Sequence, residues 1–405
     1  AAGAMRGYGM PQASFADESH AEECAKAVGM TPLEYRWKNL MPKGYVDGFS
    51  KNENHSDTLN QVLDKGEAWM DYSRKHREYE NQTGPVRRGV GCALFWYNTA
   101  VWPISLESCS CRMVLNQDGS IQLQTGETEI GQGADTAYAQ MTAEALGLSD
   151  YKKVHVVSCQ DTDITPTGLG AYASRQTYVT GKATEKCALE LRGKICALGA
   201  KLLGCDKEQV SFDGREVRVE EGENAGKTIN LSDIATASMN GNSIELQATV
   251  THSSEISPPP YMVGAAEIEV DTETGEVTLL DYAAAVDCGT PINPNLTRVQ
   301  AEGGIAQGIG MTLTESVTYD DRGYPMENSL FQYKIPARVD IGKIRVEFEN
   351  SYEGEGPFGA KSIGEVVINT PLPAISDAIR NAVGKRFYEL PITPEKIAMA
   401  ALEKK

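Results

Sequence analysis

Residues 286–294 read VDCGTPINP, and the segment RVQAEGGIAQGIG, residues 298–310, follows them. The apolar start and the later Gly and Pro residues predict the end of a strand and a turn. The second segment predicts a helix with an unusually high glycine content.

Strands and helices are predicted on both sides of this unit. Upstream, residues 111–126 read CRMVLNQDGSIQLQTG, in which Asp118-Gly119 marks a hairpin between two alternating runs. Cys109 and Cys111 lie on the same predicted strand, and we expect one to point inward and the other outward. Further helices are predicted at about 16–28, 31–39, 372–383 and 394–403, and the second of these opens with a Thr31–Glu34 capping box.

Composition excludes several classes of protein. The 405 residues contain 38 Lys and Arg against 56 Asp and Glu, and the resulting net charge of −18 disfavours nucleic-acid binding. No apolar run is long enough to span a membrane. The nine cysteines include no C-x4-C-x2-C series for an iron–sulfur cluster, and the five histidines lack metal-ligand spacing. We therefore expect a soluble, cytoplasmic protein with reduced thiols.

Residues 357–365 read PFGAKSIGE and form the most suggestive chemical motif. Its glycines would let the backbone approach a bulky partner, with Glu365 facing that partner as a general base. The alternative interpretation is a glycine turn in which Glu365 caps the next segment. Three other Gly-rich segments, residues 5–9, 130–133 and 168–176, suggest an organic, phosphorylated cofactor, because two of them precede helices whose free N–H groups could bind an anion.

The ordered set MRGYGMPQ, TEIGQGADT, GAYASRQTYVTG, DCGTPINP and FGAKSIGE resembles the molybdenum-binding subunit of the xanthine dehydrogenase and aldehyde oxidoreductase family, the molybdenum hydroxylases. The resemblance covers only the later half of that subunit, since the family's earlier GGGFGGKE segment is absent. It implies an α+β fold with mixed sheets and packed helices. It also implies two domains: residues 1–85 as the C-terminal part of a first molybdopterin-binding domain plus a linker helix, and residues 86–405 as a second one.

Site residues follow from the resemblance position by position. Glu365 matches the family's catalytic base, which accepts a proton as oxygen attacks an electron-poor carbon. The metal is held by the pterin dithiolene and not by side chains. The residues that match the family's cofactor contacts are Ile130, Gly131, Gln132, Gly133, Ala173, Ser174, Gln176 and Gln300.

Three residues bear on the substrate. Arg6 matches the arginine that steadies the substrate in xanthine-oxidising members, which favours a purine or another N-heterocycle. Leu40 stands where purine-oxidising members carry a stacking Phe, although Trp102 could stack from another direction. The aldehyde reading, oxidation of aldehydes to carboxylates by the same machinery, therefore stays open. A non-enzymatic structural or assembly subunit is the remaining alternative.

The resemblance also implies an assembly. The chain is expected to be a natural split subunit, similar to the medium subunit of nicotinate dehydrogenase-like enzymes, or a fragment of a longer one. Its partners would be a chain with the missing N-terminal half, an iron–sulfur subunit with two-iron clusters and an FAD subunit. The cofactor would be molybdopterin, as the cytosine dinucleotide, with a terminal sulfido or selenido ligand on molybdenum.

Overall fold

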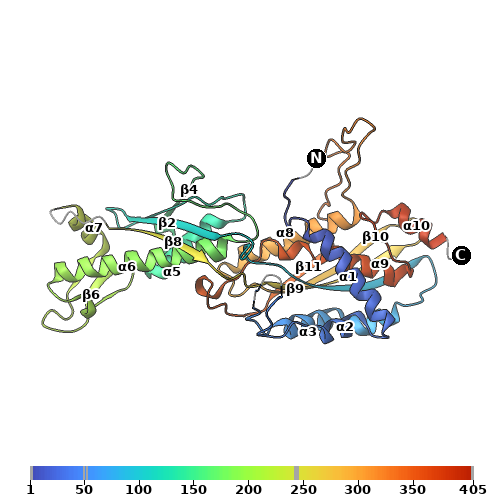
Figure 1. Ribbon diagram of the computed structural model, residues 1–405, viewed down its shortest axis with the longest axis horizontal. Coiled ribbons are helices and arrows are strands. Elements are labelled where there is room, and N and C mark those ends of the chain that lie inside the picture. Colours follow the sequence, from blue (N-terminus) through green and yellow to red (C-terminus); the bar gives the residue numbers. More distant parts are fainter. Residues whose placement is uncertain (1–2, 49–50, 52, 241–245, 403–405) are drawn as a thin grey trace. The chain divides into compact units, whose positions relative to one another are not determined.

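The computed structural model describes residues 3–48, 51, 53–240 and 246–402, which form two compact units (Figure 1). The first unit contains the chain up to Asn98, then Pro258–Tyr352, and the chain from Ile363 onward. The second contains Thr99–Ser257 and Glu353–Ser362. Each combines helices with at least one sheet, so the α+β class is confirmed. The proposed domain boundary near residue 85 is not tested by this division and stays a prediction.

The first unit is built on a four-stranded sheet. In spatial order its strands are β1 (Val86–Trp96), β9 (Tyr261–Asp271), β10 (Val277–Asp287) and β11 (Lys343–Phe348). The first three pair antiparallel, whereas β11 runs parallel to β10. β9 is buried along almost its whole length, the pattern of a strand covered on both faces.

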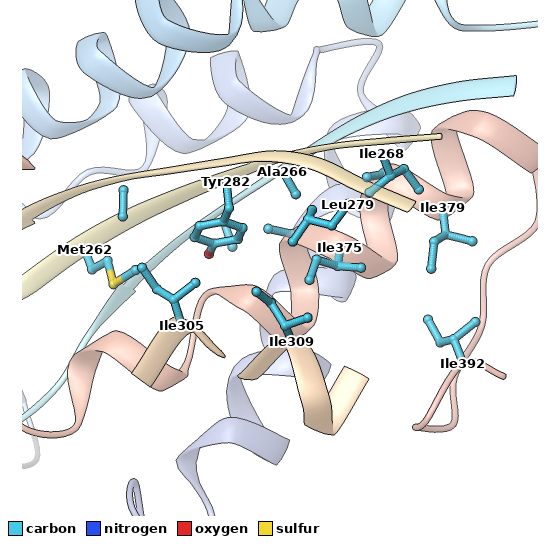
Figure 2. Packing of buried hydrophobic residues seen from close by; sticks show 14 of the residues in the cluster. Met262, Ala266, Ile268, Leu279, Tyr282, Ile305, Ile309, Ile375, Ile379 and Ile392 are labelled. Atoms are coloured by element: carbon cyan, nitrogen blue, oxygen red, sulfur yellow. The ribbon is translucent and has the colours of Figure 1, made fainter. Parts of the chain in front are cut away.

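Helices cover both faces of this sheet. Figure 2 shows one face, where Ile305 of α8 (Pro294–Leu313) and Ile375 of α9 (Pro371–Val383) approach Tyr282 of β10. On the other face α3 (Leu59–Met70) joins a separate apolar cluster with alternate residues of β9 and β10. Successive side chains of a strand point to opposite faces, so β9 and β10 supply both clusters.

The backbone of α9 lies directly on β1 because two glycines leave room for it. A Cβ atom added to Gly91 would lie 2.0 Å from the carbonyl oxygen of Ala374, and one added to Gly89 would lie 1.9 Å from that of Ala378. Real Cβ atoms do not approach oxygen so closely. Any side chain at these positions would push α9 off the sheet.

Buried ion pairs attach two N-terminal helices to this core. Glu22 of α1 (Met10–Ala27) accepts a 2.6 Å hydrogen bond from Arg380 of α9 and a shorter one from Arg386. Burial and the neighbouring Glu22 raise the pKa of Asp377, which also pairs with Arg386. Arg36 of α2 (Pro32–Lys38) bonds Glu18 of α1 at 2.8 Å. The network fixes the helix that starts just after Arg6.

Two local predictions in this region have different outcomes. The Thr31–Glu34 capping box is confirmed, with hydrogen bonds of 2.8 Å and 3.3 Å that start α2. In contrast, α1 begins at Met10 and not near residue 16. The physical reason is the start sequence: Gly9 adopts φ 91°, and Pro11 has a fixed φ that suits the first helical turn.

The second unit contains a sheet of β4 (Val154–Ser158), β3 (Ile121–Thr125), β2 (Glu107–Leu115) and β8 (Gln247–Ser254), in that order. The Asp118-Gly119 hairpin joins β2 and β3, as predicted. Helices α5 (Ala134–Leu146) and α6 (Gly181–Leu203) pack together, and α6 lies on β2 and β8. A smaller group holds β5 (Val210–Phe212), β6 (Glu216–Val219), β7 (Thr228–Asn230) and α7 (Leu231–Met239).

The remaining helices of the described residues are α4 (Tyr72–Glu78) and α10 (Pro394–Leu402) in the first unit. Across the described residues, no helix combines the length and the apolar character that crossing a membrane requires.

The prediction for Cys109 and Cys111 is wrong. Both thiols are buried, because residues two apart on a strand lie on the same face. Buried and partly buried residues alternate strictly along β2, and both cysteines occupy buried positions. Cys111 lies 3.5 Å from the hydroxyl of Thr184 on α6.

A buried arginine joins β2 to the loop after β3. Arg175 is fully buried, and its guanidinium donates to Glu107 and to Glu127 at 2.6 Å each and to the carbonyl oxygen of Ser108 at 2.7 Å. Burial by itself would lower the pKa of Arg175, but the two carboxylates outweigh it and raise the pKa above its usual value. Segment 168–176 was expected to contact a cofactor, whereas the Arg175 guanidinium within it is used inside the protein.

We expect Gly91→Ala to lower the free energy of unfolding of the first unit by about 3 kcal/mol, the upper end of overpacking costs, because the added methyl meets the α9 backbone. Gly303→Ala is the matched control. A Cβ there meets nothing within 4 Å, and alanine should stabilise α8 by up to about 1 kcal/mol. Urea unfolding measures both, and equal effects of the two variants would contradict the close packing of α9 on β1.

We expect Arg175→Met to lower the free energy of unfolding by about 3–5 kcal/mol, because it leaves two carboxylates buried without their cation. In the control Arg218→Met, the lost partner Glu216 is solvated and the cost should stay below about 1 kcal/mol. Chemical unfolding of both purified variants gives the comparison. A loss at Arg175 as small as that at Arg218 would show that the buried network contributes little.

Candidate active site

Glu365 and Arg6 come together in the first unit although they lie near opposite ends of the chain. The backbone N–H of Gly7 donates to Oε1 of Glu365 at 3.1 Å. Arg6 Nη2 donates to the carbonyl oxygen and to Oε1 of Gln300, at 3.0 Å and 3.2 Å, and Nη1 donates to Gln307 at 3.2 Å. Arg6 Nε also donates to the carbonyl oxygen of Gly364. The structure thus brings together three of the predicted site residues.

Local structure explains this meeting. Gln300, Gly304 and Gln307 lie on one face of α8, since they are four and three residues apart. A Cβ on Gly304 would lie 3.2 Å from Cζ of Arg6 and 2.4 Å from Val367, so only glycine leaves space for both. Glu365 directly precedes the short helix η5 (Val366–Ile368), whose side chains are fully buried.

The alternative role of Glu365 as a helix cap is not supported. Glu365 occupies the N-cap position of η5, yet its side chain makes no capping hydrogen bond there. The carboxylate is instead bonded to Gly7 of another segment. The main-chain oxygen of Glu365 accepts a 2.7 Å hydrogen bond from the side chain of Asn369, which fixes the backbone at Glu365.

Electrostatics tie Glu365 to two neighbours. Burial lowers the pKa of Arg6 to about 10, and the Glu365 carboxylate opposes that shift. Arg6 therefore remains protonated at neutral pH. Tyr97, the residue that follows β1, has its pKa raised by burial and by the nearby Glu365 carboxylate. The group combines one cation, one carboxylate and several amides, which suits a polar, planar substrate that accepts hydrogen bonds.

Gln132 and Gln176 form a second group, in the second unit. Nε2 of Gln132 donates to Oε1 of Gln176 at 2.7 Å, and Nε2 of Gln176 donates to Glu127 at 3.1 Å. Gln176 opens a π-helical turn, η2 (Gln176–Thr180), that leads into α6. Such turns are frequent at functional sites. The two amides are held as a unit by the buried carboxylate behind them.

Three N–H groups at the start of α5, which we expected to be free, are bonded within the protein, and the predicted cofactor contacts of this turn stay a prediction. Glu129 accepts hydrogen bonds from the backbone of Gly131 at 2.7 Å, Gly133 at 3.1 Å and Asp135 at 3.1 Å. Burial favours a higher pKa for Glu129, but these N–H donors outweigh it and hold the pKa below its usual value. The anion that the helix start attracts is a side chain of the protein itself. Ile130, beside it, is largely exposed.

The loop before η2 has an unusual backbone. Ala173 and Ser174 both adopt positive φ, 47° and 54°, which non-glycine residues rarely do. The carbonyl oxygen of Ala173 accepts a 2.7 Å bond from the N–H of Ala100. Strained residues persist only where the surroundings enforce them, and they concentrate at ligand sites.

Leu40 and Trp102, two of the predicted substrate-binding residues, lie in different units. Leu40 is in the first unit, partly buried against the apolar cluster beside α3. Trp102 is in the second, partly exposed, and its carbonyl oxygen accepts a 2.9 Å bond from Ser257.

Sequence reasoning missed four residues that contribute to these groups. Gln307 had a usable signal, since it lies two helical turns after Gln300 on the same face. Glu127 and Glu129 stand just before the glycine turn, and the second of them could have been considered as its cap. No local pattern marks Tyr97, because its partner is distant in sequence.

Comparisons with known proteins identify the family of this chain. A model described as a molybdopterin cofactor-binding domain matches residues 65–342, and a second model of the same description matches residues 1–40. The chain is 35% identical to a putative xanthine dehydrogenase molybdenum-binding subunit of Escherichia coli, over 98% of this chain and 53% of that protein. It is 30% identical to an aldehyde oxidoreductase of Megalodesulfovibrio gigas, over 98% of this chain and 41% of that protein.

Among solved structures, quinoline 2-oxidoreductase from Pseudomonas putida has a TM-score of 0.88 and 26% identity, over 99% of this chain and 53% of that one. The chain spans about half the length of the curated relatives it matches. One family model accounts for more than half of this chain, and the second covers the Arg6 segment. The chain belongs to the family of molybdopterin cofactor-binding domains, as its motifs indicated.

Proposed function

We propose that this chain supplies part of the active site of a molybdenum hydroxylase, an oxidoreductase that inserts an oxygen from water at an electron-poor carbon of a purine or another N-heterocycle. The observation that carries the proposal is the placement of Glu365. Its carboxylate is fixed by Gly7 beside a protonated Arg6 and is not used as a cap. A partly exposed, positioned carboxylate next to a cation is what a general base for a polar substrate requires.

The residues present fit the cofactor. The π-turn of Gln176 and the strained Ala173 and Ser174 form a constrained loop that holds polar groups in fixed positions. We assign contacts with the pterin and its phosphate to this loop and to Gln132, and a further contact to Gln300. The glycine turn completes the set of proposed cofactor residues: Ile130, Gly131 and Gly133.

When bound, the molybdenum cofactor supplies the two-electron redox chemistry of the hydroxylation. Glu365 accepts the proton released as the new carbon–oxygen bond forms. Gly7 orients the carboxylate toward that proton. Arg6 lies beside it and stabilises negative charge that develops on a heterocyclic substrate. Leu40 and Trp102 are our proposed substrate contacts, with Leu40 providing an apolar and not a stacking surface.

One alternative uses the same machinery. Aldehydes need no aromatic clamp, and Leu40 replaces a stacking residue, so oxidation of an aldehyde to a carboxylate is the second candidate. The similarity to the aldehyde oxidoreductase supports it. A structural or assembly role without a complete site is the non-enzymatic alternative. Absence of molybdenum and pterin phosphate from the purified complex would favour that role and overturn both enzymatic ones.

The finer parts of the assembly are also proposals. We infer that the cofactor carries a cytosine nucleotide and that molybdenum has a terminal sulfido or selenido ligand. We further infer a cytoplasmic complex with a chain carrying the missing Mo-binding half, an iron–sulfur subunit and an FAD subunit. Support for these features comes from the resemblance of the motifs to the molybdenum hydroxylase family. The division into residues 1–85 and 86–405 belongs to the same proposal.

We expect Glu365→Gln to lower kcat by about 10²–10⁴-fold, the usual contribution of a general base, because the amide keeps the shape but cannot accept the proton. Molybdenum content should be unchanged. Glu273→Gln, at an exposed carboxylate between β9 and β10, serves as the control and should keep full activity. Steady-state kinetics of the purified holo-complex tests this, and near-normal turnover by Glu365→Gln would exclude its role as base.

We expect Arg6→Ala to lower kcat/KM for hypoxanthine or nicotinate by about 10²-fold, the scale of losing one charge-stabilising donor, and to leave a simple aldehyde little affected. Gln307→Ala removes one hydrogen-bond partner of Arg6 and is the control for displacement of the Arg6 side chain. Because the pKa of Arg6 is about 10, heterocycle turnover should also fall as the pH rises through 10. Equal losses for both substrate classes would contradict a role specific to heterocycles.

A further inference from the structure

The side-chain amides of Gln132 and Gln176, which we call the amide pair, have a fixed orientation. The Thr128 carbonyl oxygen can only accept, and it lies 2.8 Å from Nε2 of Gln132 and 3.0 Å from Nε2 of Gln176. The N–H of Ile130 can only donate, and its nitrogen lies 2.7 Å from Oε1 of Gln132. Exchanging oxygen and nitrogen in either amide would set like groups against each other. Backbone groups thus determine which way both amides point.

Every donor of the amide pair is already used. Each amide nitrogen carries two hydrogens. Gln132 donates one to Thr128 and the other to Oε1 of Gln176 at 2.7 Å. Gln176 donates one to Thr128 and the other to Oε2 of Glu127 at 3.1 Å. Each carbonyl oxygen of the pair accepts one hydrogen bond within the part of the chain that the structure describes, and such an oxygen can accept two. The pair therefore offers a ligand acceptors but no donors.

The adjoining start of α5 has the same character. Glu129 accepts the N–H groups of Gly131 and Gly133, which are then not available to a ligand. Asp135, in the first turn, adds a second carboxylate, and the nearby Glu129 together with burial raises the pKa of Asp135. Helix starts usually attract phosphate, but like charges repel. This end of α5 therefore disfavours a phosphate group.

Glu127 supports the amide pair from inside the protein. The residue is fully buried. Its Oε1 accepts from Arg175 at 2.6 Å and from the Thr180 hydroxyl at 2.9 Å. Its Oε2 accepts from Gln176 and from the N–H of Gly170, both at 3.1 Å. All four partners are donors, and only an ionised carboxylate accepts on both of its atoms. An amide at this position would set a donor against two of them.

We propose that Glu127 is a positioning residue that fixes the amide pair as a hydrogen-bond acceptor, so that the cofactor group bound there is an amino or ring N–H group and not a phosphate. The pterin ring carries such donors, whereas phosphate oxygens at neutral pH mainly accept. The inference rests on the proposed function, in which the amide pair contacts the cofactor. It adds the polarity of that contact and the residue that sets it.

A structure of the holo-complex tests the polarity. We expect a cofactor atom that carries hydrogen to lie within about 3.2 Å of Oε1 of Gln132 or of Gln176. A phosphate or carbonyl oxygen in that place would overturn the proposal, and so would the absence of any cofactor atom within hydrogen-bond distance. Both results leave the proposed function intact. A purified complex without molybdenum and pterin refutes the proposed function, and this inference with it.

The variant Glu127→Gln tests the positioning. Because Arg175 is charged, we expect the oxygen of the new amide to face Arg175 and its nitrogen to face Nε2 of Gln176. The amide pair then loses its fixed orientation. Purified holo-complex should release molybdenum and pterin about 10-fold faster, the scale of one mismatched buried hydrogen bond. Metal analysis and pterin fluorescence over time measure the rates.

The variant Glu107→Gln is the matched control. Glu107 is also buried and also accepts from Arg175 at 2.6 Å, but its other hydrogen bond comes from the backbone of Val101. Chemical unfolding should show similar losses of stability in the two variants, and only Glu127→Gln should release the cofactor faster. Equal release rates would reduce Glu127 to a support for Arg175 and overturn the positioning role. If Glu127→Gln does not fold, the contacts in the holo-complex structure still test the proposal.

Discussion

The close approach of one segment to its surroundings is the constraint on which the first unit depends. The chain from Val367 through α9 is enclosed by glycines of two elements, β1 and α8. Gly91 admits the backbone of α9, Gly304 admits Val367, and a Cβ on Gly308 would lie 2.8 Å from Pro371. Glu365 stands two residues before this enclosed segment. Backbone packing therefore fixes the main chain at Glu365, and the hydrogen bond from Gly7 orients its carboxylate.

The polar group around Glu365 and the polar group around Gln176 are held in place by different kinds of contact. Around Glu365 the groups are partly exposed and joined by hydrogen bonds between separate segments. Around Gln176, buried carboxylates and the fully buried Arg175 hold the amides from behind. The first arrangement suits a group that must change its protonation. The second suits a rigid support, because breaking a buried network costs several times more than breaking a surface pair.

Local rules predicted what depends on neighbouring residues. The Thr31 capping box and the Asp118-Gly119 turn are set by three or four consecutive residues, and both were predicted correctly. The contacts of Arg175 could not be predicted in this way, because Glu107 and Glu127 lie far from it in sequence. The Cys109 and Cys111 error had a different origin, since the period of a strand was misapplied. The contact between Arg6 and the Gln300 helix needed the fold, because almost 300 residues separate them.

Glu129 affects which anions could bind at the start of α5. Its carboxylate occupies the N–H groups before α5, and so it acts as a tethered competitor for any anion that approaches them. A tethered group competes at a high effective concentration, on the order of millimolar for short flexible links. Small free anions are displaced easily by such a group. A phosphate would need additional contacts to displace Glu129, so charge alone would not suffice for a ligand to bind at this helix start.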